Sequence, residues 1–305
     1  MDFNLAHLVL TLRTADPADC LARLFGGRAA FEAAFRDLAC CRAGRECRAC
    51  DCRCDCPYWR VFGQELAVDP EIVRRHQKPG VPFAFRLPLP TAAVKSDRCE
   101  AGLVLVGPAV ELAPLFCRAL DRLLADGGGG TRIELVCSQD YQGRSNPLAP
   151  DGRGWDCAGL VVMSAAAVRL LGQCYAERLR ITLETPLKLV NSGRELRVFD
   201  PSLFCRTVIR RVSSLAAYYG EEGEGEEFRR LAEQARGVRL IAGNFVCGAP
   251  SGLSARYGGM SGHGLLGGGV GELAELLRLG MLFNLGKGAA FGLGRYRVEP
   301  EGGST

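Results

Sequence analysis

The stretch that decides the fold is ERLRITLETPLKLV, residues 177–190, followed by DPSLFCRTVIRRVSSLAAYY, residues 200–219. In the first segment apolar and polar residues alternate, and this period of two predicts a strand with one buried face. In the second, Asp200-Pro201 supplies an N-cap and a first-turn proline for a helix. Apolar residues recur along this helix at spacings of three and four, which predicts one buried side: Phe204, Val208, Val212, Leu215 and Tyr219.

The rest of the second half extends this pattern toward the C-terminus. An acidic, glycine-containing segment, EEGEGEE at 221–227, predicts a solvated turn. Two extended segments then predict a hairpin, a helix follows, and a glycine-rich loop leads into a last strand. These elements are predicted at 238–247 and 254–266 (hairpin), 270–284 (helix), 286–294 (loop, GKGAAFGLG) and 295–299 (strand, RYRVE).

The first half repeats the same order. Leu8, Leu10 and Leu12 alternate with polar or smaller residues, which predicts a strand. Asp16-Pro17 then begins a helix, or a pair of helices broken at Gly26-Gly27. The remaining elements are predicted at 81–87 and 102–106 (strands), 108–125 (helix) and 131–141 (strand).

Both halves therefore read βαββαβ, the order of the ferredoxin-like fold (the RRM or RAMP type). In this α+β fold, helices cover one face of an antiparallel sheet and leave the other face available for ligands. A chain of 305 residues is long enough for two such domains in tandem. We expect an N-terminal domain at 1–145 with a cysteine-rich insertion at 40–56, a linker at 146–176, and a C-terminal domain at 177–305 that carries the glycine-rich loop.

Composition excludes several classes of protein. A hydrophobic content of 48% excludes a disordered chain, and no apolar run is long enough to predict a membrane span. The N-terminus lacks a basic region before its apolar residues, so no signal peptide is expected. We therefore expect a cytoplasmic protein with reduced cysteines and no membrane partner.

The net charge is only +4, and the 38 basic residues are 34 arginines and four lysines. This balance permits a nucleic-acid-binding face without requiring one.

The glycine-rich loop is the most informative motif. Gly286, Gly288, Gly292 and Gly294 could leave backbone N–H groups open to phosphates, and Lys287, Arg295 and Arg297 add positive charge. A nucleoside-triphosphate P-loop is excluded, since Gly288 follows Lys287 where Ser or Thr is required and the first glycine of that motif is absent. The alternative is a tight loop whose glycines only satisfy turn geometry.

At this point the sequence resembles a known family. The closing pattern G-K-G-x-x-F-G-L-G-R-Y, preceded by a G-G-x-x-G segment at 258–262, resembles the signature of the Cas6 family, the CRISPR repeat-RNA endoribonucleases of the RAMP superfamily. ITLETPLKL and FDPSLFCRTVIRRV resemble the opening of the second domain of that family. RAAFEAAFRDLAC, CPYWRVFG and VPFAF extend the resemblance into the first half, so that it covers most of the chain.

The resemblance implies both the fold and an activity. It implies tandem ferredoxin-like domains, a repeat-RNA hairpin (or the crRNA made from it) as partner, and metal-independent cleavage, so that no cofactor is expected for catalysis. It also implies that other CRISPR effector subunits are potential partners. From the resemblance we also expect that residues of the glycine-rich loop contact RNA: Gly286, Lys287, Gly288, Phe291, Gly292, Gly294 and Arg295.

Arginines on the helix that follows Asp200 form a second candidate RNA contact. Arg206 and Arg210 share one face at a spacing of four, and Arg211 lies beside them. Such a row suits the phosphates of an RNA hairpin. It is also what an ordinary solvated helix face contains.

Histidine is the natural general base for RNA cleavage near neutral pH, and the chain has only three. His263, in a glycine-rich segment, is our first candidate, and His7, on the strand face opposite Leu8, is the second. His76, in the basic loop RRHQKPG, is expected to contact phosphate or solvent. Members of the resembled family carry histidines at positions that correspond to Ala33 and Asn284 here, so activity does not follow from the resemblance alone. Lys287 is then a candidate for charge stabilisation.

Seven of the fifteen cysteines lie between residues 40 and 56. Cys40, Cys47, Cys50 and Cys56 include one C-x2-C pair, and four thiolates suit tetrahedral zinc. The alternatives are a structural zinc ion and reduced cysteines without a ligand.

From the sequence we expect a CRISPR precursor-RNA processing endoribonuclease. It would cleave the repeat hairpin through attack of a ribose 2′-OH, giving a 2′,3′-cyclic phosphate and a 5′-OH. The alternative is a catalytically inactive crRNA-binding subunit of an effector complex, which the two missing histidines favour.

Overall fold

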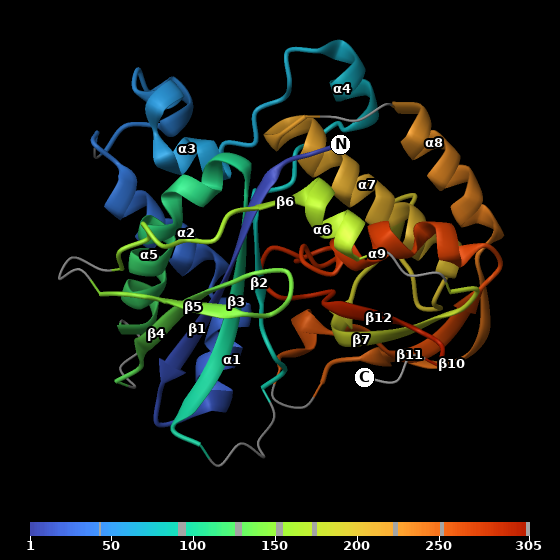
Figure 1. Ribbon diagram of the computed structural model, residues 1–305. Helices are drawn as coiled ribbons and strands as arrows, with labels where there is room; N and C mark the ends of the chain where they lie inside the picture. Colours follow the sequence, from blue (N-terminus) through green and yellow to red (C-terminus); the bar gives the residue numbers. More distant parts are fainter. Residues whose placement is uncertain are drawn as a thin grey trace.

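The computed structural model describes residues 1–42, 44–90, 96–125, 130–150, 155–172, 176–221, 225–250 and 253–302. The described residues form two large antiparallel sheets, each with helices on one side, and a small two-stranded sheet (Figure 1). The first domain (blue to green) lies beside the second (yellow to red). The predicted tandem of ferredoxin-like α+β domains is confirmed.

In the first sheet the strand order β2-β3-β1-β4 is that of a ferredoxin-like fold, and β5 and β6 extend it. Asp16 caps the first helix, accepting a hydrogen bond from the Asp19 backbone N–H at 3.0 Å. Leu8, Leu10 and Leu12 are fully buried under the helices, as their alternation predicts. The elements are β1 (Asn4–Arg13), α1 (Pro17–Gly26), α2 (Arg28–Ala39), α3 (Pro57–Phe62), α4 (Pro70–Arg75), β2 (Phe83–Arg86), β3 (Arg98–Val106), α5 (Ala113–Ala125), β4 (Arg132–Gln139), β5 (Ser145–Leu148), β6 (Met163–Ser164) and α6 (Ala165–Leu171).

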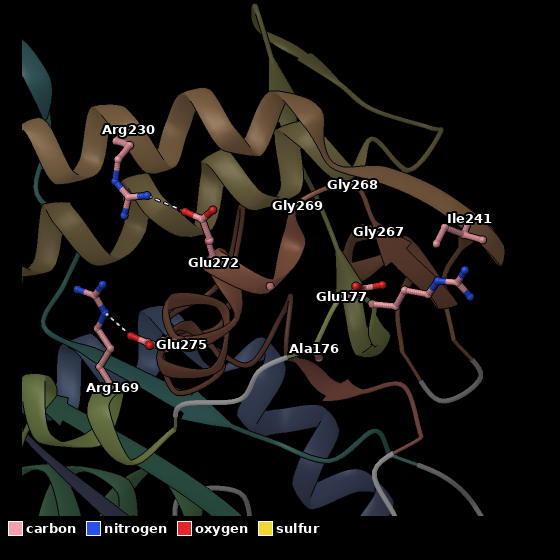
Figure 2. A pocket seen from close by; sticks show the side chains of 12 residues that line it. Arg169, Ala176, Glu177, Arg230, Ile241, Gly267, Gly268, Gly269, Glu272 and Glu275 are labelled. Carbon is pink, nitrogen blue, oxygen red and sulfur yellow. Dashed lines mark hydrogen bonds and ion pairs between the residues drawn. The ribbon is translucent and has the colours of Figure 1, made fainter.

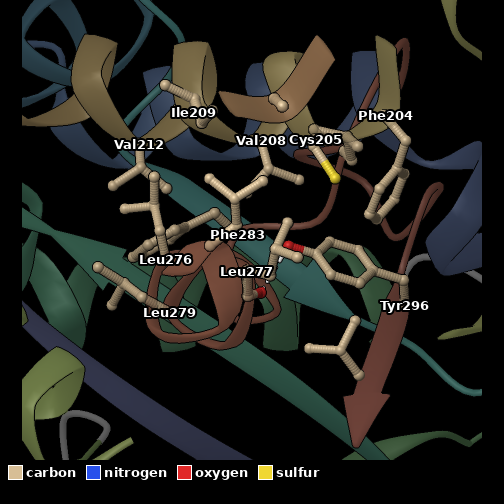
Figure 3. Close-up of a cluster of buried hydrophobic side chains, with 14 of the residues drawn as sticks. Phe204, Cys205, Val208, Ile209, Val212, Leu276, Leu277, Leu279, Phe283 and Tyr296 are labelled. Carbon is tan, nitrogen blue, oxygen red and sulfur yellow. Dashed lines mark hydrogen bonds between the residues drawn. The ribbon is translucent and has the colours of Figure 1, made fainter. Parts of the chain in front are cut away.

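The second sheet repeats this topology in the order β10-β11-β7-β12. Asp200 caps α7 by accepting from the Leu203 N–H at 2.8 Å. The apolar side of α7 packs on α9, and Tyr296 of β12 donates its hydroxyl to the Leu277 carbonyl (Figure 3). The elements are β7 (Leu179–Leu187), β8 (Val190–Asn191), β9 (Arg194–Glu195), α7 (Pro201–Tyr219), α8 (Gly225–Gln234), β10 (Arg239–Gly248), β11 (Gly259–Gly267), α9 (Ala274–Gly280) and β12 (Tyr296–Pro300).

Several boundaries differ from the predicted ones. The predicted helices 108–125 and 270–284 each begin with a 3-10 turn, and α9 ends at Gly280. Part of the predicted linker 146–176, at 151–154 and 173–175, lies outside the described residues, but the rest contains β5, β6 and α6. In the predicted turn 221–227, residues 222–224 lie outside the described part, and α8 begins at Gly225.

The two sheets differ in how their second faces are used. Next to β1, the face of the first sheet that carries Leu5 and Val104 is covered by the second domain, and Phe3 lies 5.7 Å from Phe283 between ring centroids. This covered face was expected to be open to ligands. The outward face of the second sheet is exposed, as the side chain of His263 on β11 shows.

His7 lies on the covered face, and this position sets its chemistry. Burial, with added repulsion from Arg86 and Arg295, lowers the pKa of His7 to about 3. His7 is therefore uncharged at neutral pH, and its predicted catalytic role stays a prediction.

The low pKa of His7 predicts a specific acid sensitivity. A depressed histidine pKa stabilises the fold above the unfolded value of 6.5, and this contribution is lost as the pH falls from 6.5 toward 3. Between pH 7.5 and pH 5, wild type should lose about 1 to 2 kcal/mol more unfolding free energy than His7→Gln. Urea denaturation of both proteins at both pH values measures this difference. Equal losses would show that His7 is not held neutral.

Candidate functional site

The glycine-rich loop joins the two domains. The side chain of Phe291 enters the aromatic core of the first domain, where it is 8% exposed and lies against Phe31, Phe83 and Phe85. The Phe85 backbone N–H donates to the Ala290 carbonyl at 2.9 Å. This burial contradicts the prediction that Phe291 contacts RNA. The loop holds the domains together from a position between them.

Backbone groups of the loop are largely used within the protein. The N–H groups of Lys287 and Gly294 donate to Lys188 and Pro186 carbonyls at 3.0 and 2.9 Å, and that of Arg295 donates to Thr185 Oγ1. Gly292 and Gly294 are buried, so their predicted role in cradling phosphate is also wrong. Only the tip of the loop, Lys287-Gly288, is exposed.

The glycine at position 292 serves packing. Its φ of 91° is a conformation that side-chain-bearing residues rarely adopt. A Cβ atom there would meet Phe25 and Leu87 of the first domain at 2.9 and 3.0 Å. This part of the motif therefore fits the alternative given in the sequence analysis, a tight loop whose glycines satisfy turn geometry.

Asn284 clamps the base of the same loop. It is fully buried with a φ of 52°, and its Nδ2 donates to the carbonyls of Phe85 (2.7 Å) and Ala289 (2.8 Å). At the position where the resembled family carries a histidine, this chain thus has a structural amide that ties the loop to β2.

Arg295 carries its own counter-ion. Its Nε lies 2.6 Å from the Glu184 carboxylate, which also faces Arg297 at 3.6 Å. Binding of an RNA phosphate to Arg295 would have to compete with this carboxylate. The predicted RNA contact of Arg295 stays a prediction.

Four of the predicted RNA-contacting residues meet in one cavity of about 500 Å³, which we call the basic pocket. Arg210 and Arg211 reach it from α7, and Gly286 and Lys287 from the loop tip, whereas Arg206 does not line it. The sequence missed the cations that complete the pocket, although the run RRHQKPG was a signal for them. The pocket is lined by Arg74, Arg75, His76, Gln77, Lys78, Gly80, Lys188, Leu189, Val190, Thr207, Arg210, Arg211, Ser214, Leu285, Gly286 and Lys287.

His263 and Lys287, both predicted to be catalytic, do not lie together. His263 is opposite Thr182 in the register of β11 and β7, whereas Lys287 is hydrogen-bonded to Lys188, six residues further along. At about 3.3 Å per residue this separation approaches 20 Å. The two side chains therefore extend from well-separated positions along β7.

The four cysteines predicted to bind zinc line one very small cavity of about 20 Å³. The Arg42 backbone N–H donates to Cys40 Sγ at 3.4 Å. As placed, the thiols do not form a ligand set: in the described part of the chain, no three His, Cys, Asp or Glu side chains are arranged to hold a metal ion.

A larger cavity, of about 920 Å³, lies between α6, α8, α9 and the start of the second sheet (Figure 2). Its charges are largely compensated, since Arg230 pairs with Glu272 at 2.7 Å and Arg169 with Glu275 at 3.4 Å. It therefore lacks the net positive charge of the basic pocket.

Within the described residues, no helix has the length and apolar character needed to cross a membrane.

Comparisons with known proteins agree with this architecture. Residues 181–296 match the family model of the CRISPR-associated endoribonuclease Cas6, and residues 24–146 match a model described as an N-terminal domain. The resemblance to the Cas6 family is thus confirmed, with the direct family match over the second domain. No curated protein gives a significant match.

Solved Cas6 structures share the fold over nearly the whole chain. A Cas6 product complex is 17% identical with a TM-score of 0.57, and Thermus thermophilus Cas6 is 16% identical with a TM-score of 0.55. Each alignment covers 97% of this chain and 99% of the other. A partial Cas6-RT-Cas1–Cas2 complex is 13% identical with a TM-score of 0.57, over 97% of this chain and 46% of the other.

The position of Phe291 predicts a stability effect that separates packing from RNA binding. Phe291→Ala removes a buried ring from the core of the first domain and should cost about 3 to 5 kcal/mol. Lys287→Ala, at the exposed tip of the same loop, should change stability by less than about 0.5 kcal/mol. Chemical denaturation measures both. Equal, small effects would refute the interdomain role of the loop.

Proposed function

We propose that this protein is a Cas6-type endoribonuclease that binds a CRISPR repeat hairpin and cuts it once. The observation that carries the proposal is the Cas6 family match over residues 181–296, the segment that contains α7 and the glycine-rich loop. The basic pocket supports it, because cations from α7 and the loop line this pocket together with Lys188 and cations from residues 74–78. The protein would act in the cytoplasm, on transcripts of the repeat array.

The proposed chemistry needs no metal. A base takes the proton of the ribose 2′-OH, the 2′-oxygen bonds to the adjacent phosphorus, and the bond from phosphorus to the 5′-oxygen breaks. The departing oxygen takes up a proton, leaving a 2′,3′-cyclic phosphate and a 5′-OH. The exposed ammonium of Lys287 would stabilise the charge that develops on the phosphate oxygens. The general base would contribute about 10² to 10⁴ in rate.

The rival function is RNA binding without cleavage. Asn284 and Ala33 occupy the positions where the resembled family has histidines, and Asn284 is committed to the interdomain clamp. One of the similar solved structures is a partial Cas6-RT-Cas1–Cas2 complex, so a role as a subunit among other Cas proteins is the natural alternative.

The cleavage mechanism makes a direct prediction. Repeat RNA should be cut in the presence of EDTA, and a single 2′-deoxy substitution at the cut site should abolish the reaction, because the nucleophile is then missing. Gel analysis of end-labelled RNA, with mapping of the 3′ end, measures both. Cleavage of the deoxy substrate would eliminate the mechanism, and intact wild-type substrate under all conditions would favour the binding function.

We further propose that Cys40, Cys47, Cys50 and Cys56 bind one structural zinc ion after turning toward the small cavity that they share. Four arginines also line this cavity, Arg36, Arg42, Arg45 and Arg53, and their charge would offset that of the thiolates. The ion would tie the insertion to α2 and α3 and would take no part in cleavage.

Metal analysis of the purified protein tests this proposal. Wild type should carry about one equivalent of zinc, Cys47→Ser should lose it, and Cys54→Ser should keep it, because Cys54 is exposed and does not line the cavity. Less than about a tenth of an equivalent in wild type would end the proposal.

A further inference from the structure

We propose that the basic pocket, and not the outward sheet face that carries His263, receives the phosphodiester that is cut, with Arg211 as its buried anchor and His76 as its base. This inference rests on the proposed function. The sequence predicted phosphate contacts for both residues, and the inference adds the location of the cut phosphodiester, the anchoring role of Arg211 and the catalytic role of His76.

The residues that line the pocket carry an excess of positive charge. Seven cationic side chains line it, contributed by residues 74–78, Lys188, α7 and the loop tip, and none of the lining residues is Asp or Glu. Of the lining cations, Arg74 pairs with Glu71, which lies outside the pocket, at 2.7 Å. Such a cavity attracts a polyanion and positions one of its phosphates.

Arg211 is the strongest sign of an anionic ligand. Its Nε is buried with no hydrogen-bond partner, and within the described residues no carboxylate pairs with its guanidinium. Burial lowers the pKa of Arg211 to about 10, so the side chain is still charged at neutral pH. A buried charge without a partner is costly, and a bound phosphate would offset that cost with charge-assisted hydrogen bonds.

The position of Arg211 is fixed by its neighbours. Its guanidinium packs against Gly80, where a Cβ atom would collide with it. Tyr219, about two helical turns further along α7, donates its hydroxyl to the Gly80 carbonyl and so holds this segment against the helix. The anchor is therefore in place before any ligand arrives, which is the condition for efficient stabilisation of a developing charge.

His76 is the histidine that shares a cavity with this anchor. It follows α4, and the Tyr218 hydroxyl donates to its backbone carbonyl at 2.8 Å. Lys188 and Lys287 line the same pocket and are joined through their backbones. The other two histidines are elsewhere, since His7 is held neutral between the domains and His263 lies about 20 Å along β7.

The residues of this pocket account for every proton that the reaction transfers. The His76 imidazole takes the proton of the 2′-OH as the bond from the 2′-oxygen to phosphorus forms. The bond from phosphorus to the 5′-oxygen breaks, and that oxygen takes a proton from the Lys287 ammonium. Arg211 remains charged and holds a non-bridging phosphate oxygen throughout. Exchange with water then returns a proton to Lys287 and removes one from His76.

Matched histidine variants test the location of the base. His76→Ala should lower single-turnover cleavage of repeat RNA by about 10² to 10⁴, and His263→Ala should stay within about threefold of wild type. Added imidazole should partly restore His76→Ala, which a purely structural defect would not allow. The alanine variant keeps the backbone carbonyl that Tyr218 binds, and circular dichroism verifies its fold.

Matched arginine variants test the anchor independently of cleavage. The ligand is repeat RNA with a 2′-deoxy substitution at the cut site, which prevents cleavage. Arg211→Gln should bind this RNA about tenfold or more weakly, and the slope of log affinity against log salt concentration should fall by about one, the value for one phosphate contact. Arg118→Gln, at an exposed site on α5, should bind like wild type.

The inference is overturned if His263→Ala abolishes cleavage while His76→Ala cleaves normally, or if Arg211→Gln binds as tightly as Arg118→Gln. A wild type that binds but never cleaves would instead refute the proposed enzymatic function. In that case the arginine pair still decides whether the basic pocket holds a phosphate.

Discussion

The structure depends on one packing constraint: the glycine-rich loop of the second domain must place Phe291 inside the core of the first. The ring lies among Phe31, Phe83 and Phe85, and Asn284 anchors the loop on the β2 backbone at its base. In return, Leu5 and Val104 of the first sheet join the core of the second domain. Each domain thus completes the core of the other, and the loop tip is held between them.

This constraint gives the glycine-rich motif two parts with different roles. The buried part, from Ala289 to Gly294, serves packing, and its glycines allow backbone conformations and close approaches that side chains would prevent. The exposed part is Lys287-Gly288, whose position is set by the buried part and by the backbone bond to Lys188. Because α7 and residues 74–80 meet the same tip, the basic pocket exists only when the two domains are joined.

The electrostatics follow from the placement of charges and not from their sum. The net charge is only +4 because 34 acidic residues offset 38 basic ones. Many arginines lie next to acids, as in the Arg98–Glu134 and Arg295–Glu184 ion pairs. The basic pocket is different, because its arginines and lysines converge without acids among its lining residues. A local concentration of cations attracts the phosphate backbone of a nucleic acid.

The sequence predicted the fold well because strands and helices leave periodic patterns. The alternation at Leu8, Leu10 and Leu12 and the stripe from Phe204 to Tyr219 each correspond to a buried face. The site was predicted less well, because it is built from contacts between distant segments that no local pattern encodes. Phe291 looks like an exposed motif residue until the partner domain is present, and His76 looks solvated until α7 lies beside it. The short helix α6 was missed because only seven residues form it.

Hydrogen exchange in the glycine-rich loop tests the central claim most directly. If the loop is an interdomain clamp, the amides of Phe291 and Gly294 should exchange slowly in the RNA-free protein, because both residues are buried and both N–H groups are bonded internally. Addition of repeat RNA should then change their protection little. Fast exchange in the free protein, with strong protection only when RNA is added, would show that the loop is an open phosphate cradle and would contradict the account.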